Sequence, residues 1–210
     1  MKIFPNKLKS GDQVRIIAPS LSMSTLSQEN IDLAIRKLES LGLRVTFGKH
    51  VNEDDIFGSS SVQSRIDDLH NAFQDKEVKA ILAVRGGSNA NQLLKYIDYG
   101  LIKINPKIFC GYSDITALQS AFLKMAGLVT YSGPSFSTFA MTDGFDYTFD
   151  YFRRILFNRA PVELASSTNW SEDNLKINEN NNVFYKNEGY WLINAGKATG
   201  TIVGGNLSTF

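Results

Sequence analysis

The feature that most constrains the fold is an alternation of short apolar runs with amphipathic helical segments over the first two-thirds of the chain. This alternation is typical of a parallel β-sheet covered by helices, and so of an α/β fold. The apolar runs predict strands at residues 14–18, 45–47, 80–84, 107–111 and 128–131. Helical periodicity predicts a helix capped by Ser27, a second over 62–73, a third over 89–96 and a fourth over 115–125.

Successive strand–helix–strand units form right-handed crossovers, which place the carboxyl ends of all strands at one edge of the sheet. Ligands of such sheets bind at that edge. We therefore expect the segments that follow Ala18, Val84 and Gly111 to converge there and to form the functional site.

Composition excludes several classes of protein. The formal net charge is +1 and no long Lys/Arg run occurs, which argues against a nucleic-acid partner. The single cysteine, Cys110, excludes an internal disulfide and a multi-cysteine metal site. No segment has the length of a membrane span and the amino terminus has no signal-peptide core. We expect a cytoplasmic protein without a membrane partner, metal or cofactor.

Beyond about residue 158 the chain becomes rich in Asn, Ser, Thr and Glu, with a polar run at 178–182. Aromatic residues such as Trp170 and Trp191 surround this run, so we predict a loop or linker rather than a disordered domain. Two further strands are predicted at 190–195 and 200–203.

Ser113 lies between a predicted strand and a predicted helix, in the sequence Gly-Tyr-Ser-Asp. A serine at such a corner exposes its hydroxyl, and the N–H groups that open the helix favour a developing negative charge. The second glycine of a nucleophile elbow is absent, because Ile115 occupies its place. On these residues alone, Ser113 as a helix cap and Asp114 as a first-turn dipole partner are the stronger interpretations.

Arg85, Gly86 and Gly87 also follow a strand. Two glycines let the backbone approach a ligand closely, although a plain turn is the simpler interpretation and the lysine of a phosphate-binding loop is missing. If this loop lies beside Ser113, the N–H groups of Gly87 and Asp114 can share one oxyanion.

A serine nucleophile needs a base, and the chain has only two histidines. We interpret His70 as a partly buried structural residue and His50 as a solvated one. Cys110, a rival nucleophile, lies inside an apolar run and is interpreted as a buried structural residue.

Several ordered motifs resemble the LD-carboxypeptidase family of serine peptidases. They are VRGG at 84–87, NANQLL at 89–94, GYSDITAL at 111–118, TYSGP at 130–134 and GTIVGGNL at 200–207. The NANQLL segment is closer to the branch that contains microcin C self-immunity proteins.

The resemblance implies a flavodoxin-like, class I amidotransferase-like sheet with helices on both faces, and a smaller C-terminal swivelling β/α domain. We expect the first domain at 1–160, a linker at 161–185 and the first strands of the second domain at 186–210. The resemblance also implies that Ser113 is the nucleophile of a Ser–His–Glu triad, with Gly87 and Asp114 as backbone oxyanion donors. We assign Arg85, Gly86, Ser88 and Tyr112 to substrate binding.

In this family the Glu and His follow the GGNL motif, and no histidine follows His70 here. We therefore expect the chain to be the N-terminal part of a homodimeric serine carboxypeptidase, nearly inactive alone. The expected substrate is a small peptide or an aminoacyl-nucleotide. Two alternatives are a non-catalytic module that binds a ligand or partner and, more weakly, a receiver-like or nucleotide-binding module.

Overall fold

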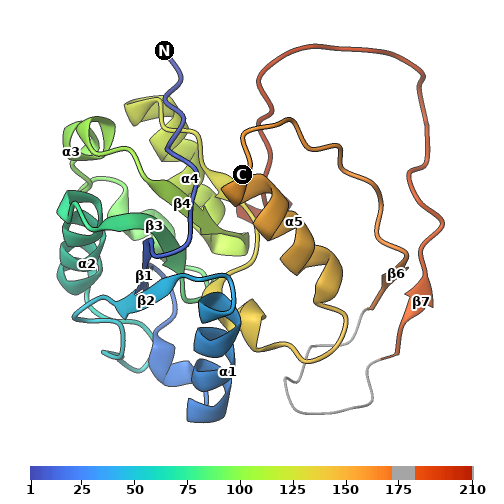
Figure 1. Cartoon of the computed structure of the whole chain (residues 1–210). Helices are drawn as coiled ribbons and strands as arrows, with labels where there is room; N and C mark the ends of the chain where they lie inside the picture. The colour runs from blue at the N-terminus through green and yellow to red at the C-terminus, as the bar shows by residue number, and fades with distance from the viewer. Residues whose placement is uncertain (172–182, 210) are drawn as a thin grey trace.

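A five-stranded parallel sheet in the order β2-β1-β3-β4-β5 forms the centre of the molecule (Figure 1). The computed structural model describes residues 1–171 and 183–209. The strands are β1 (Gln13–Ile17), β2 (Arg44–Phe47), β3 (Val78–Ala83), β4 (Ile108–Gly111) and β5 (Tyr131–Ser132). This order is that of flavodoxin-like sheets, so the predicted fold class is confirmed.

Helices cover both faces of the sheet. They are α1 (Gln28–Glu39), α2 (Val62–Gln74), α3 (Tyr99–Ile104), α4 (Thr116–Ala121) and α5 (Asp146–Phe157). Side chains alternate along a strand, so Leu82 of β3 packs in the core that contains α1 and α5 residues. Its neighbour Ile81 packs in the opposite core, with residues of α2, α3 and α4.

Local sequence explains where the predicted helices begin. The Ser27 hydroxyl accepts the N–H of Asn30 and caps α1, as predicted, and Ser61 caps α2 by accepting the N–H of Ser64. Short single-turn helices complete the layers. They are η1 (Met23–Thr25), η2 (Ala90–Leu93), η3 (Ser113–Ile115), the π-type η4 (Phe122–Ala126), η5 (Phe136–Ala140) and η6 (Leu207–Thr209).

Two elements and the environment of one residue differ from the sequence prediction. The helix predicted at 89–96 is only the 3-10 turn η2, and α3 starts later because Asp98 caps it by accepting the N–H of Leu101. The sequence pattern placed Met125 on the buried face of the fourth predicted helix, but Met125 is 61% exposed. The reason is that α4 continues as the π-type turn η4, which rotates this face. Strand β5 has two residues and overlaps the strand predicted at 128–131 only at Tyr131.

The C-terminal part forms little regular structure. Strands β6 (Asn169–Trp170) and β7 (Tyr185–Lys186) pair antiparallel, and the polar run at 178–182 lies outside the described residues. The predicted strands at 190–195 and 200–203 are wrong. Within the described ranges no strand pairs with them, and side chains such as Ile193 and Ile202 are more than 90% exposed.

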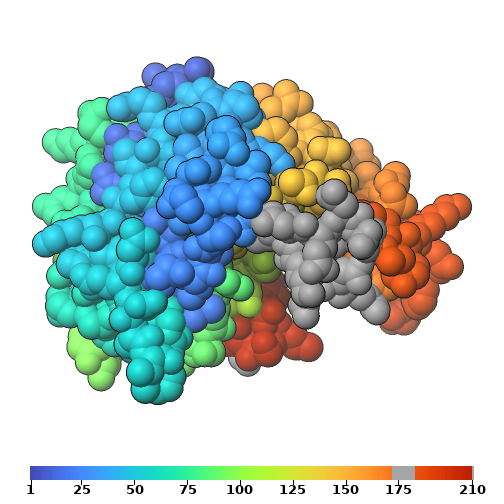
Figure 2. Space-filling view, turned by 90° about the horizontal axis from the view of Figure 1, so that it is seen from below, coloured from blue at the N-terminus to red at the C-terminus, as the bar shows by residue number. Residues whose placement is uncertain are grey.

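The end of the described chain returns to the sheet domain. Gly205 lies against the Thr116 side chain, and the N–H of Asn206 donates to the Thr116 hydroxyl at 3.0 Å. In Figure 2 this red segment lies against the green surface of the sheet domain. The boundaries predicted at 160 and 185 stay predictions.

None of the helices over 1–171 and 183–209 combines the length and the apolar character that a bilayer crossing requires.

Candidate active site

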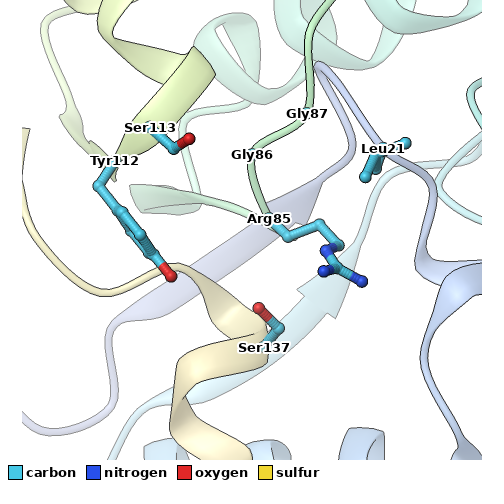
Figure 3. Close-up of a pocket in the computed structure, with 7 residues that line it drawn as sticks. All are labelled: Leu21, Arg85, Gly86, Gly87, Tyr112, Ser113 and Ser137. Carbon is cyan, nitrogen blue, oxygen red and sulfur yellow. The ribbon is translucent and has the colours of Figure 1, made fainter. Parts of the chain in front are cut away.

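A cavity of about 250 Å³ opens at the carboxyl edge of the sheet, where the loops after β1, β3 and β4 converge. This is the predicted convergence. Seven residues line the cavity: Leu21, Arg85, Gly86, Gly87, Tyr112, Ser113 and Ser137 (Figure 3). Five of them were singled out from the sequence.

Ser113 occupies a strained backbone position between β4 and α4. Its φ angle is +60°, and among the described residues it is the one non-glycine residue with positive φ. Such strain is characteristic of functional sites and of the serine in a nucleophile elbow. Tyr112 is the N-cap residue and Ser113 opens η3, so the helix-cap interpretation of Ser113 does not apply. Within the described part of the chain, the Ser113 hydroxyl makes no hydrogen bond.

The loop at 85–88, here called the glycine loop, lies directly beside Ser113. A Cβ built on Gly86 would lie 2.9 Å from the Ser113 Cβ and 3.5 Å from the Asp114 nitrogen. Gly87 is packed against Ser20 and Leu21 instead. Figure 3 shows the Ser113 hydroxyl turned toward this loop. The loop needs glycine here because a side chain at either position would collide with the neighbouring loops.

Arg85 supplies the positive charge among the lining residues. Its Nη1 lies 3.5 Å from the Thr25 hydroxyl, and its side chain is partly exposed at the opening of the cavity (Figure 3). Tyr112 is 47% exposed on the same opening. Ser88 is exposed and is not part of the lining.

Two lining residues were missed by the sequence analysis. Leu21 follows β1, and Ser137 belongs to η5, whose N–H at Ser137 donates to the Val84 carbonyl at 2.9 Å. Leu21 lies three residues beyond Ala18, so the convergence rule indicated its loop. Ser137 belongs to none of the sequence motifs. Only the packing of η5 against the end of β3 brings it to the cavity.

Asp114 has a different structural role from the one its position suggested. Its carboxylate does not cap its own helix; it accepts the N–H groups of Asn89 and Ala90, both at 2.8 Å. It also accepts the Ser20 hydroxyl at 2.6 Å. The carboxylate therefore joins the loops after β1, β3 and β4 at the floor of the site.

Neither histidine lines the cavity. His50 Nδ1 lies 2.6 Å from a Glu53 carboxylate oxygen. The His50 side chain is only 17% exposed, so its predicted solvation is wrong. His70 Nε2 accepts the N–H of Asp98, and burial lowers the pKa of this imidazole. The structural interpretation of His70 is confirmed.

Cys110 is fully buried one residue before the end of β4. Burial raises the pKa of its thiol to about 12. A thiol of this kind is not an activated nucleophile, in agreement with its structural interpretation.

Comparison with known proteins extends these observations. Residues 14–133 match the model of the LD-carboxypeptidase N-terminal domain. This match covers more than half of the chain and includes the glycine loop, Ser113 and β5.

The chain belongs to the LD-carboxypeptidase family.

Two Bacillus proteins are similar to this chain, one by sequence and one also by fold. YocD of Bacillus subtilis (strain 168) is 52% identical over 207 residues, which cover 99% of this chain and 64% of YocD. The crystal structure of an MccF-like protein from Bacillus anthracis str. Ames superposes with a TM-score of 0.97 at 55% identity, over 99% of this chain and 63% of that one.

A more distant LD-carboxypeptidase relative has been solved with a ligand. The microcin C7 self-immunity protein MccF of Escherichia coli is 28% identical over 215 residues, or 96% of this chain and 61% of MccF. Its complex with aspartyl sulfamoyl adenosine superposes with a TM-score of 0.81 at 26% identity, over 89% of this chain and 58% of that one. The chain thus spans about three-fifths of the length of these relatives.

Proposed function

We propose that this chain provides the nucleophile half of a serine carboxypeptidase that cleaves an amide bond in a small substrate. The Ser113 Oγ forms a bond to the substrate carbonyl carbon, and the C–N bond then breaks to leave an acyl-enzyme. The hydroxyl proton passes through a base to the leaving amine. Water next cleaves the ester, which releases the acid and restores the serine hydroxyl.

The backbone strain at Ser113, in a cavity beside the glycine loop, carries this proposal. The strained corner exposes the hydroxyl, and the N–H groups of Gly87 and Asp114 are the proposed oxyanion donors. Gly86 allows the close approach between the glycine loop and Ser113.

Arg85 favours a substrate with an anionic group. It is the cation among the lining residues, and a guanidinium pairs well with a carboxylate or a phosphate-like group. A peptide carboxylate and an aminoacyl-nucleotide both satisfy this requirement. The aspartyl sulfamoyl adenosine bound by MccF supports the second class, and the family resemblance supports murein peptides with an L,D linkage. Gly86, Ser88 and Tyr112 are the other proposed substrate contacts, and a homodimer is the proposed assembly.

The base is the part of this mechanism that the described residues do not supply. Neither His50 nor His70 lines the cavity, and no carboxylate is among its lining residues. Without the base, serine hydrolases retain only about 10³–10⁴-fold acceleration over water. We therefore propose that these 210 residues alone hydrolyse the substrate slowly.

Labelling with a fluorophosphonate, located by peptide mass spectrometry, tests the nucleophile. We expect covalent label on Ser113 at a rate above that of exposed serines, loss of that label in Ser113→Ala and no change in the control Ser40→Ala. Absence of label on Ser113 in the unmodified chain would contradict the proposal.

The absence of a base among the described residues that line the cavity favours one alternative, a module that binds the same ligands without cleaving them. Isothermal titration calorimetry with aspartyl sulfamoyl adenosine separates the two. Binding by a chain whose Ser113 is inert to the fluorophosphonate supports the binding module, and binding together with labelling supports the hydrolase.

A further inference from the structure

The glycine loop is held at both of its ends. At its start, the Val84 N–H donates to the Ile17 carbonyl at 2.8 Å and the Val84 carbonyl accepts the Ser137 N–H. At its end, the Asn89 and Ala90 N–H groups donate to one oxygen of the Asp114 carboxylate. The four residues 85–88 span these anchors and include Gly86, on which a Cβ would lie 2.9 Å from the Ser113 Cβ.

The downstream anchor replaces a cap that the local sequence lacks. Asn89 occupies the N-cap position of η2, yet its own side chain makes no capping hydrogen bond. The N–H groups that open η2 need an acceptor, and Asp114 supplies it from the neighbouring strand-to-helix corner. Asp114 is only 7% exposed, and the fully buried Ser20 hydroxyl donates to the same oxygen. A carboxylate with three short hydrogen bonds in a buried position has little freedom to move.

Arg65 of α2 holds Asn89 from the other side. Its Nη1 donates to the Asn89 backbone carbonyl at 3.1 Å and to the Asn89 side-chain oxygen at 3.2 Å. The same nitrogen donates to the Pro19 carbonyl at 3.3 Å, and Nη2 donates to the Gln92 side chain at 2.7 Å. Arg65 is 3% exposed, so these bonds form largely away from water.

The buried cation therefore does not pair directly with the buried carboxylate. Asn89 lies between them, because its backbone N–H donates to Asp114 while its carbonyl accepts from Arg65. A buried charge needs such partners, since an unsatisfied one is strongly destabilising. The arrangement fixes the two peptide groups that flank the Asn89 Cα, at the point where the glycine loop ends.

We propose that the Asp114 carboxylate and Arg65 are positioning residues that hold the glycine loop against Ser113. This inference rests on the proposed function of Ser113 as the nucleophile. A glycine-containing loop has many accessible backbone conformations, so its geometry depends on its anchors. Displacement of reacting groups by about 1 Å lowers reaction rates by about 100-fold.

Two variants test this role in the 210-residue chain. Asp114→Asn keeps the shape of the side chain but removes its charge, and Arg65→Met keeps an unbranched apolar stem but removes the guanidinium donors. The matched controls are Asp143→Asn and Arg36→Met, both at exposed positions. Arg65→Lys keeps the cation, and we expect it to recover part of what Arg65→Met loses.

The first measurement is the concentration dependence of fluorophosphonate labelling at Ser113. We expect the maximal labelling rate to fall by about 10- to 100-fold in Asp114→Asn and Arg65→Met, while the half-saturating concentration stays within about twofold. The second measurement is amide hydrogen exchange. We expect faster exchange in peptides that cover 85–90 and no change in α1 and α5.

The two measurements separate the outcomes. Unchanged labelling together with unchanged exchange at 85–90 overturns the proposal. Faster exchange throughout the chain also overturns it, because both residues would then contribute to the stability of the whole fold. If Asp114→Asn does not fold, Ser20→Ala removes a single bond to the carboxylate and gives a smaller effect of the same kind. If the unmodified chain is not labelled, the hydrolase function fails, and local exchange at 85–90 alone decides whether the loop is held in this way.

Discussion

The Gly86 backbone lies close to the Ser113 side chain. A methyl group on Gly86 would lie 2.9 Å from the Ser113 Cβ and 3.1 Å from its Oγ. These residues come from different loops, after β3 and after β4. Both residues line the cavity of the candidate active site.

Gly86→Ala introduces that methyl group without demanding an unusual backbone conformation. We expect the glycine loop or Ser113 to shift, and the rate of Ser113 labelling by a fluorophosphonate to fall by about 100-fold. Gly196→Ala is the matched control, because its added Cβ meets no atom within 4 Å. Equal labelling of the two variants would show that this contact does not set the reactivity of Ser113.

The Cys110 thiol is predicted to be inert in the folded protein. Burial raises its pKa to about 12, so almost no thiolate exists at pH 8. We expect reaction with Ellman's reagent to be at least about 100-fold slower in buffer than in concentrated urea, where the thiol has an ordinary pKa near 8.5. Rapid reaction of the folded chain would contradict the buried position of Cys110.

Lys107 is predicted to make stability depend on alkaline pH. Burial lowers the pKa of its amine from 10.5 to about 8, and the amine donates to the carbonyls of Asp75 and Val78. Between pH 8 and 10.5 the unfolded chain binds more protons at this site than the folded chain does. The free energy of unfolding should therefore gain a contribution that rises with pH across this window.

Urea unfolding between pH 7.5 and 10.5 measures this contribution. We expect Lys107→Met to flatten the rise, whereas Lys103→Met, at an exposed position of α3, leaves it unchanged. Identical slopes for the two variants would mean that Lys107 titrates alike in the folded and unfolded chains.

Phe139 is predicted to be a major contributor to stability. Its ring is fully buried, with ring centroids 5.2 Å from Phe145 and 5.0 Å from Phe152. We expect Phe139→Ala to lower the free energy of unfolding by about 3–5 kcal/mol, since it removes a large buried group and leaves a cavity. Phe57→Ala, at a 74% exposed position, should change it by less than about 0.5 kcal/mol. Denaturant unfolding of both variants checks the difference.

Sequence patterns were most informative where burial has a regular period. The continuous apolar run at 80–84 predicted β3, and the apolar stripe after Ser27 predicted α1. They were misleading at 190–195, where the apolar residues predicted a strand that the structure does not form. Apolar character alone does not make a strand, because a strand also needs a neighbour to satisfy its backbone N–H and carbonyl groups.

The sequence by itself determined the α/β class, the edge at which the loops converge and the identity of Ser113, Arg85, Gly86 and Gly87 as candidate residues. These follow from local periodicity and from the handedness of crossovers, which depend on neighbouring residues along the chain. The family motifs agreed with them independently.

Only the tertiary structure decided which groups surround Ser113 and what holds them. It placed Ser137 in the cavity beside residues that are distant in sequence. It also joined residues 24 or more positions apart by hydrogen bonds, from Asn89 and Ala90 to Asp114 and from Arg65 to Asn89. No local pattern encodes such contacts, because they depend on how separate loops pack at the sheet edge. The same packing shows Asp114 as the anchor of the glycine loop, where the sequence suggested a partner for the dipole of its own helix.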